Sequence, residues 1–255
     1  MNKKMTALVA GLAMCGAAFA QDEEEAPVLL EAEAGFFDGW DGSVSFGLFG
    51  TSGNTERYNM RADIDGGRKT DRHITSFLGT FTKAAASSEI TEQKGRFFAN
   101  NDFLIDDSEW AVFANANLEY DEFKEAWDTR LSLFGGAGRV LFDDDKTFLN
   151  ARAGFGATRE IGGVEEDWTF EGLLGADLTH KLTESQSLEA KVVVNPELED
   201  VGEFRVFTRV AWTMMVAPSA NMSLIVGAEN TYDSSPGAGD KRNDIDYFAM
   251  LSWAY

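Results

Sequence analysis

Short polar turns recur along this chain at a nearly constant interval, and this repeat restricts the fold more than any other feature. The turn clusters lie at 69–72, 106–109, 143–146, 183–186 and 218–221, so their starts are 35 to 40 residues apart. Longer polar segments alternate with them, at 85–94, 121–128, 160–167, 196–203 and 233–244. A regular interval of this kind indicates a repeated structural unit. Alternating short and long connections predict a meander of about 12 antiparallel strands.

The segments between these connections are too long for strands of an ordinary soluble sheet. Each holds roughly 11 to 16 residues, whereas a typical strand has about 5–6 and a tilted strand that crosses a bilayer needs about 9–11. Lipid offers no hydrogen-bond partner to an open sheet edge, so membrane-spanning strands must close into a barrel. We therefore predict an all-β fold, an antiparallel up-and-down transmembrane β-barrel over residues 40–255. Both termini fall on the side of the short turns, which is the periplasmic side in outer-membrane barrels.

Alternation of residue types predicts which side chains face lipid. In segment 110–120, Trp110 and Leu118 share the parity of other apolar residues, while Asn117 and Glu119 have the opposite parity. Three further segments alternate in the same way, at 168–178, 188–194 and 204–216. The pattern is blurred in 95–105 and 130–142, where we assign no faces and where a bulge would shift the parity.

The last ten residues, DYFAMLSWAY, read as a final membrane strand. Tyr247, Leu251, Trp253 and Tyr255 lie on one face of it. This segment resembles the final strand by which outer-membrane barrels in general are recognised by the barrel-assembly machinery. Strand addition to an exposed edge is a physical route to such recognition. We therefore predict that these four residues form a C-terminal assembly signal.

The first 20 residues have the pattern of a secretory signal peptide. Two lysines precede an apolar core of about 10 residues, which is too short to span a membrane as a helix, and an A-x-A cleavage site ends at Ala20. The alternative is a lipoprotein acylated at Cys15, although Met14 is bulky where such signals carry a small residue. After cleavage at Ala20 the mature chain would contain no cysteine. The acidic residues 21–39 would then form a periplasmic linker.

The composition excludes nucleic acid as a partner and gives no sign of a cofactor. The formal charge is −21, whereas nucleic acid requires a basic face. Glycine-rich runs at 134–140 and 151–160 are followed by no predicted helix, so we interpret them as strand glycines and not as phosphate loops. The aspartates at 143–145 lack EF-hand spacing and are interpreted as a solvated turn. The expected partners are outer-membrane lipid and the assembly machinery.

Two stretches resemble a known bacterial family. The first carries Trp40, Gly42, Val44 and Gly47, followed by Thr51-Ser52-Gly53-Asn54-Thr55; the second carries Tyr120, Asp121, Phe123, Arg130, Gly136 and Gly138. Together they resemble domain-of-unknown-function family 481, whose members are called salt-induced outer-membrane proteins. The resemblance implies an outer-membrane β-barrel and no established activity, and it supplies no catalytic residue. Ser52, Gly53, Asn54 and Thr55 suit a tight hairpin turn, because Gly and Asn tolerate positive φ; an exposed recognition site is the alternative.

Inward positions of the predicted strands carry charges of both signs. They are Arg61, Asp63, Asp65, Glu119, Arg152, Glu171, Asp177, Glu189, Lys191, Arg205, Arg209 and Glu229. Buried charges must be paired or hydrated, so the interior is either a salt-bridged plug or a wet lumen. Eight strands make a filled barrel and 16 an open one. A barrel of about 12 strands therefore leaves permeability undecided.

These observations favour a non-enzymatic barrel of the bacterial outer membrane. It would be a narrow, porin-like pore for small solutes or a structural envelope component, with osmotic stress suggested only by the family resemblance. One alternative is a lipid-modifying hydrolase or acyltransferase, which would use a histidine as base. Only His73 and His180 exist, and both lie beside short turns, away from the outer leaflet. The other alternative, a surface-binding barrel, rests on acidic loops of modest length.

Overall fold

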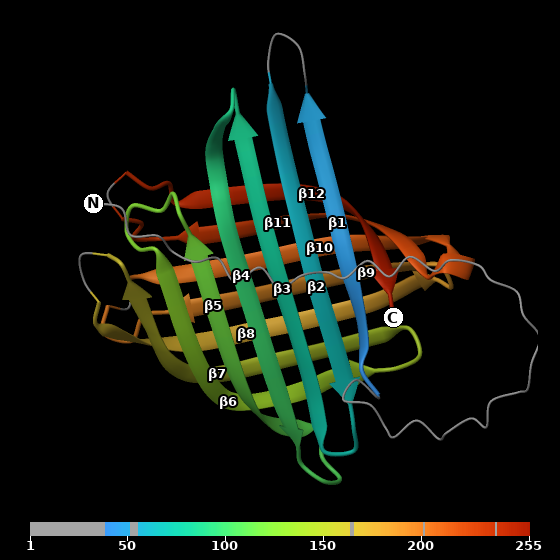
Figure 1. The fold of residues 1–255 in the computed structure, drawn as a ribbon. Helices are drawn as coiled ribbons and strands as arrows, with labels where there is room; N and C mark the ends of the chain where they lie inside the picture. The colour runs from blue at the N-terminus through green and yellow to red at the C-terminus, as the bar shows by residue number, and fades with distance from the viewer. Residues whose placement is uncertain (1–38, 52–55, 164–165, 201, 238) are drawn as a thin grey trace, which may run out of the picture. The chain divides into compact units, whose positions relative to one another are not determined.

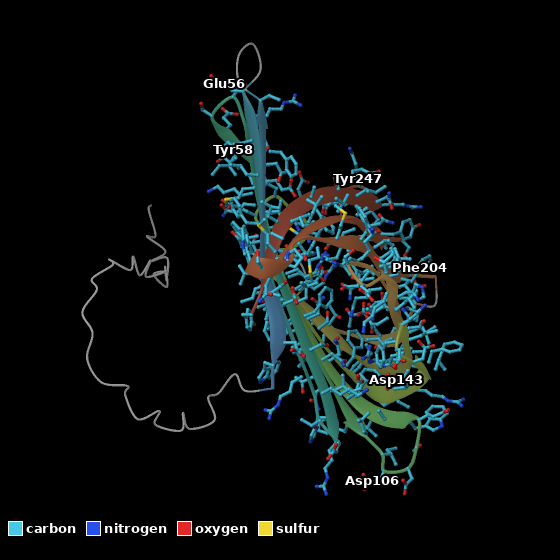
Figure 2. All side chains as sticks on the ribbon, turned by 90° about the vertical axis from the view of Figure 1, so that its right-hand side faces the viewer. Glu56, Tyr58, Asp106, Asp143, Phe204 and Tyr247 are labelled. Atoms are coloured by element: carbon cyan, nitrogen blue, oxygen red, sulfur yellow. The ribbon has the colours of Figure 1, made fainter. Side chains whose placement is uncertain are left out.

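The computed structural model describes residues 39–51, 56–163, 166–200, 202–237 and 239–255 (Figure 1). The predicted signal peptide 1–20, nearly all of the linker 21–39 and the signature turn Ser52–Thr55 lie outside the described residues. We call the end of the barrel that carries Asp106 and Asp143 the turn end. The opposite end, which carries Glu56 and Phe204, is the loop end (Figure 2).

Twelve strands make up nearly all of the described chain. They are β1 (Asp41–Thr51), β2 (Arg57–Lys69), β3 (His73–Ala86), β4 (Glu89–Leu104), β5 (Trp110–Asp121), β6 (Thr129–Asp143), β7 (Thr147–Ile161), β8 (Trp168–Thr183), β9 (Gln186–Pro196), β10 (Phe204–Ala217), β11 (Met222–Asp233) and β12 (Asn243–Ala254). A single 3₁₀ turn, η1 (Pro218–Ala220), separates β10 from β11. Among these described residues, no helix is long and apolar enough to cross a membrane.

Each strand pairs antiparallel with the next along the chain, and β12 pairs with β1 to close the ring. The predicted fold class, an all-β, up-and-down antiparallel barrel of about 12 strands, is therefore confirmed. The strands have 11 to 16 residues. In Figure 1, β1 to β4 cross in front of the remaining strands, as the tilted strands of a barrel do.

The connections follow the predicted alternation with one exception. A long polar loop was expected at 85–94, but β3 continues to Ala86 and β4 begins at Glu89. Ser87 and Ser88 form a two-residue turn, with φ of 51° and 69°. Positive φ at both central residues is the geometry that matches the twist of a tight hairpin. The polar residues expected in a loop instead belong to two strands that extend beyond their neighbours.

Exposure follows the predicted parity in segment 110–120, whereas in segment 188–194 Glu189, expected to face inward, is exposed. Trp110 and Val112 are exposed, whereas Ala111 and Phe113 are buried. In segment 95–105, where no face was assigned, Phe97 is exposed while Phe98 contacts other interior side chains. Aromatic residues on both faces explain why this alternation could not be read from the sequence.

Outward aromatic residues gather near both ends of the strands. Trp110, Trp253 and Tyr255 lie toward the turn end, and Tyr58, Trp168 and Tyr247 toward the loop end. Two aromatic belts with apolar residues between them are typical of a surface that crosses a lipid bilayer.

Glycines allow β6 and β7 to approach each other closely. Gly136 and Gly154 are partners in the β6–β7 register. A Cβ on Gly136 would lie 2.5 Å from the Gly154 Cα and 2.9 Å from the Phe113 Cε1. The glycine-rich runs are therefore strand segments, and their lack of side chains makes room for a buried hydrophobic cluster of Phe113, Phe134 and Leu173.

Candidate functional site

The barrel interior is filled with ionisable side chains that pair with one another. Ten of the charges expected there take part in such ion pairs, from seven strands; they are Arg61, Asp63, Glu119, Arg152, Glu171, Asp177, Lys191, Arg205, Arg209 and Glu229. The structure groups them into separate clusters, described below.

The seam cluster consists of Arg61, Asp63, Arg209 and Glu229, and all four side chains are nearly buried. Arg61 Nε lies 2.8 Å from Asp63 Oδ1, and Arg61 Nη2 lies 2.6 Å from Glu229 Oε1. Arg209 pairs directly with Glu229 and lies 3.4 Å from Asp63. Two cations and two anions thus compensate each other, which buried charges require.

The seam cluster crosses the place where the barrel closes. Arg61 belongs to β2 and Glu229 to β11, and in the ring these strands are separated by β1 and β12. The guanidinium carbons of Arg61 and Arg209 lie 4.3 and 4.8 Å from the ring centre of Phe248, on β12. These are cation–π distances. The cluster therefore ties β2, β10, β11 and β12 together from the inside.

A second group, the far cluster, consists of Asp102, Arg152, Asp177 and Lys191, and it borders the seam cluster where Lys191 pairs in register with Arg209. Arg152 forms a two-pronged contact with Asp102, with Nε–Oδ1 at 2.9 Å and Nη2–Oδ2 at 2.6 Å. Asp177 accepts hydrogen bonds from both Arg152 and Lys191. Bidentate arginine–carboxylate pairs are among the strongest charge-assisted hydrogen bonds. This cluster joins β4, β7, β8 and β9.

Other side chains make contacts across the middle of the barrel. The rings of Phe98 on β4 and Phe207 on β10 are 5.3 Å apart between centres, although these strands lie six places apart in the ring of twelve. Arg96 on β4 reaches the same Phe207 ring at 4.7 Å and donates to Thr231 Oγ1 on β11 at 3.2 Å. Side chains therefore bridge the cross-section at this level, beside a cavity of about 60 Å³ that Phe98 and Phe207 also line.

Cavities lie on both sides of the seam cluster. A turn-end cavity of about 290 Å³ is lined by Arg209 together with Asp65 and Glu189. A loop-end cavity of about 60 Å³ is lined by Arg61 and Glu229. By the space one buried water needs, roughly 10–15 Å³ in this measure, the smaller cavity holds a handful of waters. The seam cluster thus contributes side chains to both cavities.

The sequence did not identify Asp102 and Arg96 as interior charges. Asp102 is almost completely buried at the centre of the far cluster, and Arg96 pairs with Glu119. Both lie in segment 95–105, where the apolar alternation is blurred. Arg96 and Asp102 nevertheless share one parity with Asn100, so charged and amide residues could have indicated the inward face where apolar residues did not.

The histidines lie on separate strands. His73 begins β3, and its Nδ1 contacts the Asn101 side chain at 3.4 Å. His180 lies near the end of β8, with Nδ1 3.0 Å from Thr147 Oγ1. Within the described part of the chain, no group of three or more His, Cys, Asp or Glu side chains could hold a metal ion.

The four residues of the predicted assembly signal, Tyr247, Leu251, Trp253 and Tyr255, are all exposed on the outward face of the final segment. Tyr255 donates its backbone N–H to the Gly42 carbonyl at 3.1 Å. A Cβ on Gly42 would overlap the Tyr255 ring. The chain end is thus in contact with the start of β1.

Comparison with known proteins identifies a family but no relative of known activity. The sequence matches the family described as "Protein of unknown function, DUF481" over residues 44–255, as its motifs predicted. No curated protein matches the sequence.

Three solved barrels resemble the structure weakly. The NanC porin aligns with a TM-score of 0.43 and 10% identity, covering 84% of this chain and 96% of the porin. The translocator domain of autotransporter NalP from Neisseria meningitidis aligns at 0.40 and 11%, covering 85% and 87%. The β domain of the Bordetella autotransporter BrkA aligns at 0.37 and 11%, covering 85% and 97%. Scores this low carry no argument about function.

Proposed function

The chain belongs to the family described as protein of unknown function, DUF481, and we propose that it forms a narrow outer-membrane pore for small solutes, held closed by its own interior side chains. The signal-peptide pattern and the two aromatic belts support export to the outer membrane. The short turns would face the periplasm and the loop end the exterior. The pore would be a passive barrel without catalytic activity.

The observation that carries this proposal is the position of the seam cluster between two cavities. Arg61 and Glu229 line the loop-end cavity, while Arg209 lines the turn-end cavity. Moving this one layer of side chains would connect the cavities. A permanently open pore would require a continuous gap through the interior. In another part of the cross-section, the contact between Phe98 and Phe207 interrupts such a gap.

The energetics favour a closed resting state. Removing one partner from a buried ion pair costs about 3–5 kcal/mol, because the other charge is left uncompensated. The four residues share their charges in a closed ring of contacts. They would therefore move together, and openings would be brief and rare.

The pairing of the interior charges favours a pore over an enzyme, because these charges already satisfy one another. Carboxylates that could act as acid or base are held by arginines, as Glu171 is by Arg205 at 2.6 Å. The histidines lie apart, beside the turn end. An enzyme acting on the outer leaflet would need its base near the loop end.

Conductance of the refolded mature chain in planar bilayers tests the proposal. The double variant Arg209→Ala with Glu229→Ala removes one cation and one anion, so the interior charge balance is kept. It leaves the Arg61–Asp63 pair intact. We expect wild type to show rare, small openings and the variant a several-fold higher conductance.

The matched control is Arg139→Ala with Glu109→Ala, an exposed Arg–Glu pair at the turn end. It should conduct like wild type. Silence of wild type and of the seam variant alike, with both correctly folded, would reject the pore and favour a purely structural barrel.

Membrane orientation is tested separately with single cysteines in a mature chain that starts after Cys15. Ser108 lies in a connection at the turn end and Gly239 in the connection between β11 and β12. An impermeant maleimide added to intact cells should label Gly239→Cys and spare Ser108→Cys. The reverse result would invert the orientation.

A further inference from the structure

The barrel is closed by fewer backbone pairs at β1–β12 than anywhere else in its ring. Only four rows pair, with Ser43 to Phe46 opposite Ala254 to Leu251. On its other side the same β1 pairs with β2 over all eleven of its residues. Among the described residues, Gly47 to Gly50 of β1 therefore pair with a strand on one side only, and so does the part of β12 before Leu251.

Upper β1 has both faces exposed. Leu48 is outward by parity and is 62% exposed, and Phe49 is inward by parity yet is 51% exposed. On β12, Tyr247 is 81% exposed. Figure 2 shows Glu56 and Tyr58, which follow the β1–β2 tip, standing well beyond the body of the barrel and apart from Tyr247. The two strands still touch at Gly47, where a Cβ would lie 2.5 Å from the Ala249 carbonyl oxygen. Beyond Gly47 they diverge, and we call the gap between them the seam opening.

The loop-end cavity lies behind this opening. Its lining includes Arg61 from β2 and Asp244 and Asp246 from β12. These are the strands on either side of β1 in the ring. The cavity is therefore placed to be reached sideways, between upper β1 and β12.

Loops at the loop end of the barrel cover the same cavity. Trp127, in the loop between β5 and β6, is buried and lines it. Lys124 of this loop lies 3.7 Å from Asp240 and from Asp244. Ala126 contacts Gly237 so closely that a Cβ on Gly237 would overlap the Ala126 side chain. These loop residues therefore obstruct access to the cavity along the barrel axis.

The charges of the cavity indicate what kind of head group it would accept. Its lining carries seven basic and six acidic side chains. Most of them are paired, as Lys94 is with Asp246 at 2.7 Å. Lys241 and Arg242 have no ion pair with any described residue. Asp121 has no ion pair with a described residue either; its carboxylate accepts the Phe123 backbone N–H. Two basic and one acidic side chain of the lining are therefore unpaired, and the balance of this unpaired charge is basic.

We infer that the seam opening is a lateral port, through which a single-chain amphiphile with a small anionic head enters the loop-end cavity from the outer leaflet. The head would displace the few waters of the cavity and meet its basic side chains. The apolar chain would lie between Leu48, Phe49 and Tyr247. Open backbone edges are costly in hydrocarbon, but these rows lie next to the loop-end aromatic belt, where head groups and water reach. The inference does not require the seam cluster to conduct.

Cysteine pairs across the seam test the port. Leu48→Cys with Ala249→Cys lies two rows beyond the last observed pair, on the outward face, and its disulfide would close the opening. Val44→Cys with Trp253→Cys joins a row that is already paired and is the control. Each is made in the mature chain without Cys15, inserted in nanodiscs, and assayed for saturable binding of radiolabelled dodecanoate above empty nanodiscs.

We expect the oxidised Leu48–Ala249 pair to weaken dodecanoate binding about tenfold or more, reduction to restore it, and the control disulfide to leave it unchanged. Dodecyltrimethylammonium, with the same chain and a cationic head, should bind far less than dodecanoate. Unchanged binding by the locked barrel, equal binding of the cationic amphiphile, or no saturable binding by wild type would each overturn the inference. So would oxidation of the Leu48–Ala249 pair as fast as the control, because the seam would then be closed in the membrane. Conductance plays no part in these readouts, so they are independent of the pore proposal.

Discussion

The β6–β7 contact and the β1–β12 contact close neighbouring strands by different means. β6 and β7 pair over fourteen rows, and glycines bring their backbones close together. β1 and β12 pair over four rows. The β1–β12 contact has few backbone hydrogen bonds. Ion pairs inside the barrel, between strands that are not neighbours, compensate for them. Closure of this barrel thus depends on backbone in one region and on side chains in the other.

This difference predicts the largest loss of stability at the seam cluster. Glu229→Ala leaves Arg61 and Arg209 buried without one of their two carboxylates, and we expect unfolding free energy to fall by about 3–5 kcal/mol. Urea unfolding of the barrel in lipid vesicles measures it. The matched control is Glu109→Ala, an exposed glutamate paired with Arg139, which should cost at most about 1 kcal/mol. Equal effects of the two variants would mean that the seam cluster does not hold the closure.

At the far side of the barrel, the backbone contact itself should be the sensitive feature. Gly154→Ala places a Cβ against the backbone of Gly135 and against the Phe113 ring, 2.9 Å from Cζ. Overpacking of this kind costs about 1–3 kcal/mol, occasionally more. The control is Gly95→Ala, whose Cβ would meet its nearest atom at 3.6 Å. Heat-modifiable barrel in the membrane fraction should drop for the first variant and not for the second. Normal assembly of Gly154→Ala would show that this contact tolerates separation.

Phe248 distinguishes a cation–π contribution from burial at the seam. Phe248→Leu keeps an apolar side chain but removes the ring that both seam arginines approach. Loss of desolvated cation–π contacts predicts destabilisation of about 1–2 kcal/mol, measured by the same urea unfolding. Phe155→Leu, at an outward and highly exposed ring, is the control and should change little. If Arg209→Ala with Glu229→Ala makes Phe248→Leu no less costly, the contact of the ring with Arg209 contributes nothing, and only burial and the contact with Arg61 remain.

Much of this architecture could be predicted from the sequence because it depends on local pattern. Strand number and closure follow from turn spacing and strand length, and the inward charges at 119, 171 and 205 follow from parity within one strand. The expected loop at 85–94 was wrong because serines at 87 and 88 adopt positive φ and a two-residue turn suffices. Composition alone does not distinguish polar strand residues from a polar loop.

The grouping of charges could not be predicted, because it depends on which strands face each other across the ring. Arg61 and Glu229 are 168 residues apart and belong to strands that do not pair. Their contact follows from closure, barrel diameter and the direction of long side chains. The same holds for Phe98 and Phe207, which meet across the interior. The short β1–β12 pairing is likewise a property of strand stagger and has no signature in the sequence.

The smallest predicted effect concerns charges that the barrel leaves unbalanced, in contrast to the compensated seam cluster. Glu197 follows β9 at the loop end, and burial, together with the nearby carboxylates of Glu203 and Glu171, raises its pKa above the ordinary range. A carboxyl whose pKa is higher in the folded than in the unfolded state binds its proton more tightly when folded. Its stabilising contribution is therefore fully present below the unfolded pKa of about 4.3 and is lost as pH rises through the folded value. Acidification from neutral pH should thus slightly stabilise the barrel through this residue, and Glu197→Gln should remove that part of the pH dependence.

Carboxyl ¹³C NMR of Glu197 in nanodiscs measures the pKa directly. Glu203→Gln should lower the pKa of Glu197 only part of the way toward the ordinary value, because burial is the larger cause and remains. Asp144 is the internal control, since hydrogen bonds from the backbone N–H groups of Lys146 and Thr147 hold its pKa below the ordinary range and Glu203→Gln should not move it. A Glu197 pKa at or below the ordinary value would mean that the loop-end carboxylates are separated by water. The charges at the loop end would then be as well compensated as those of the seam cluster.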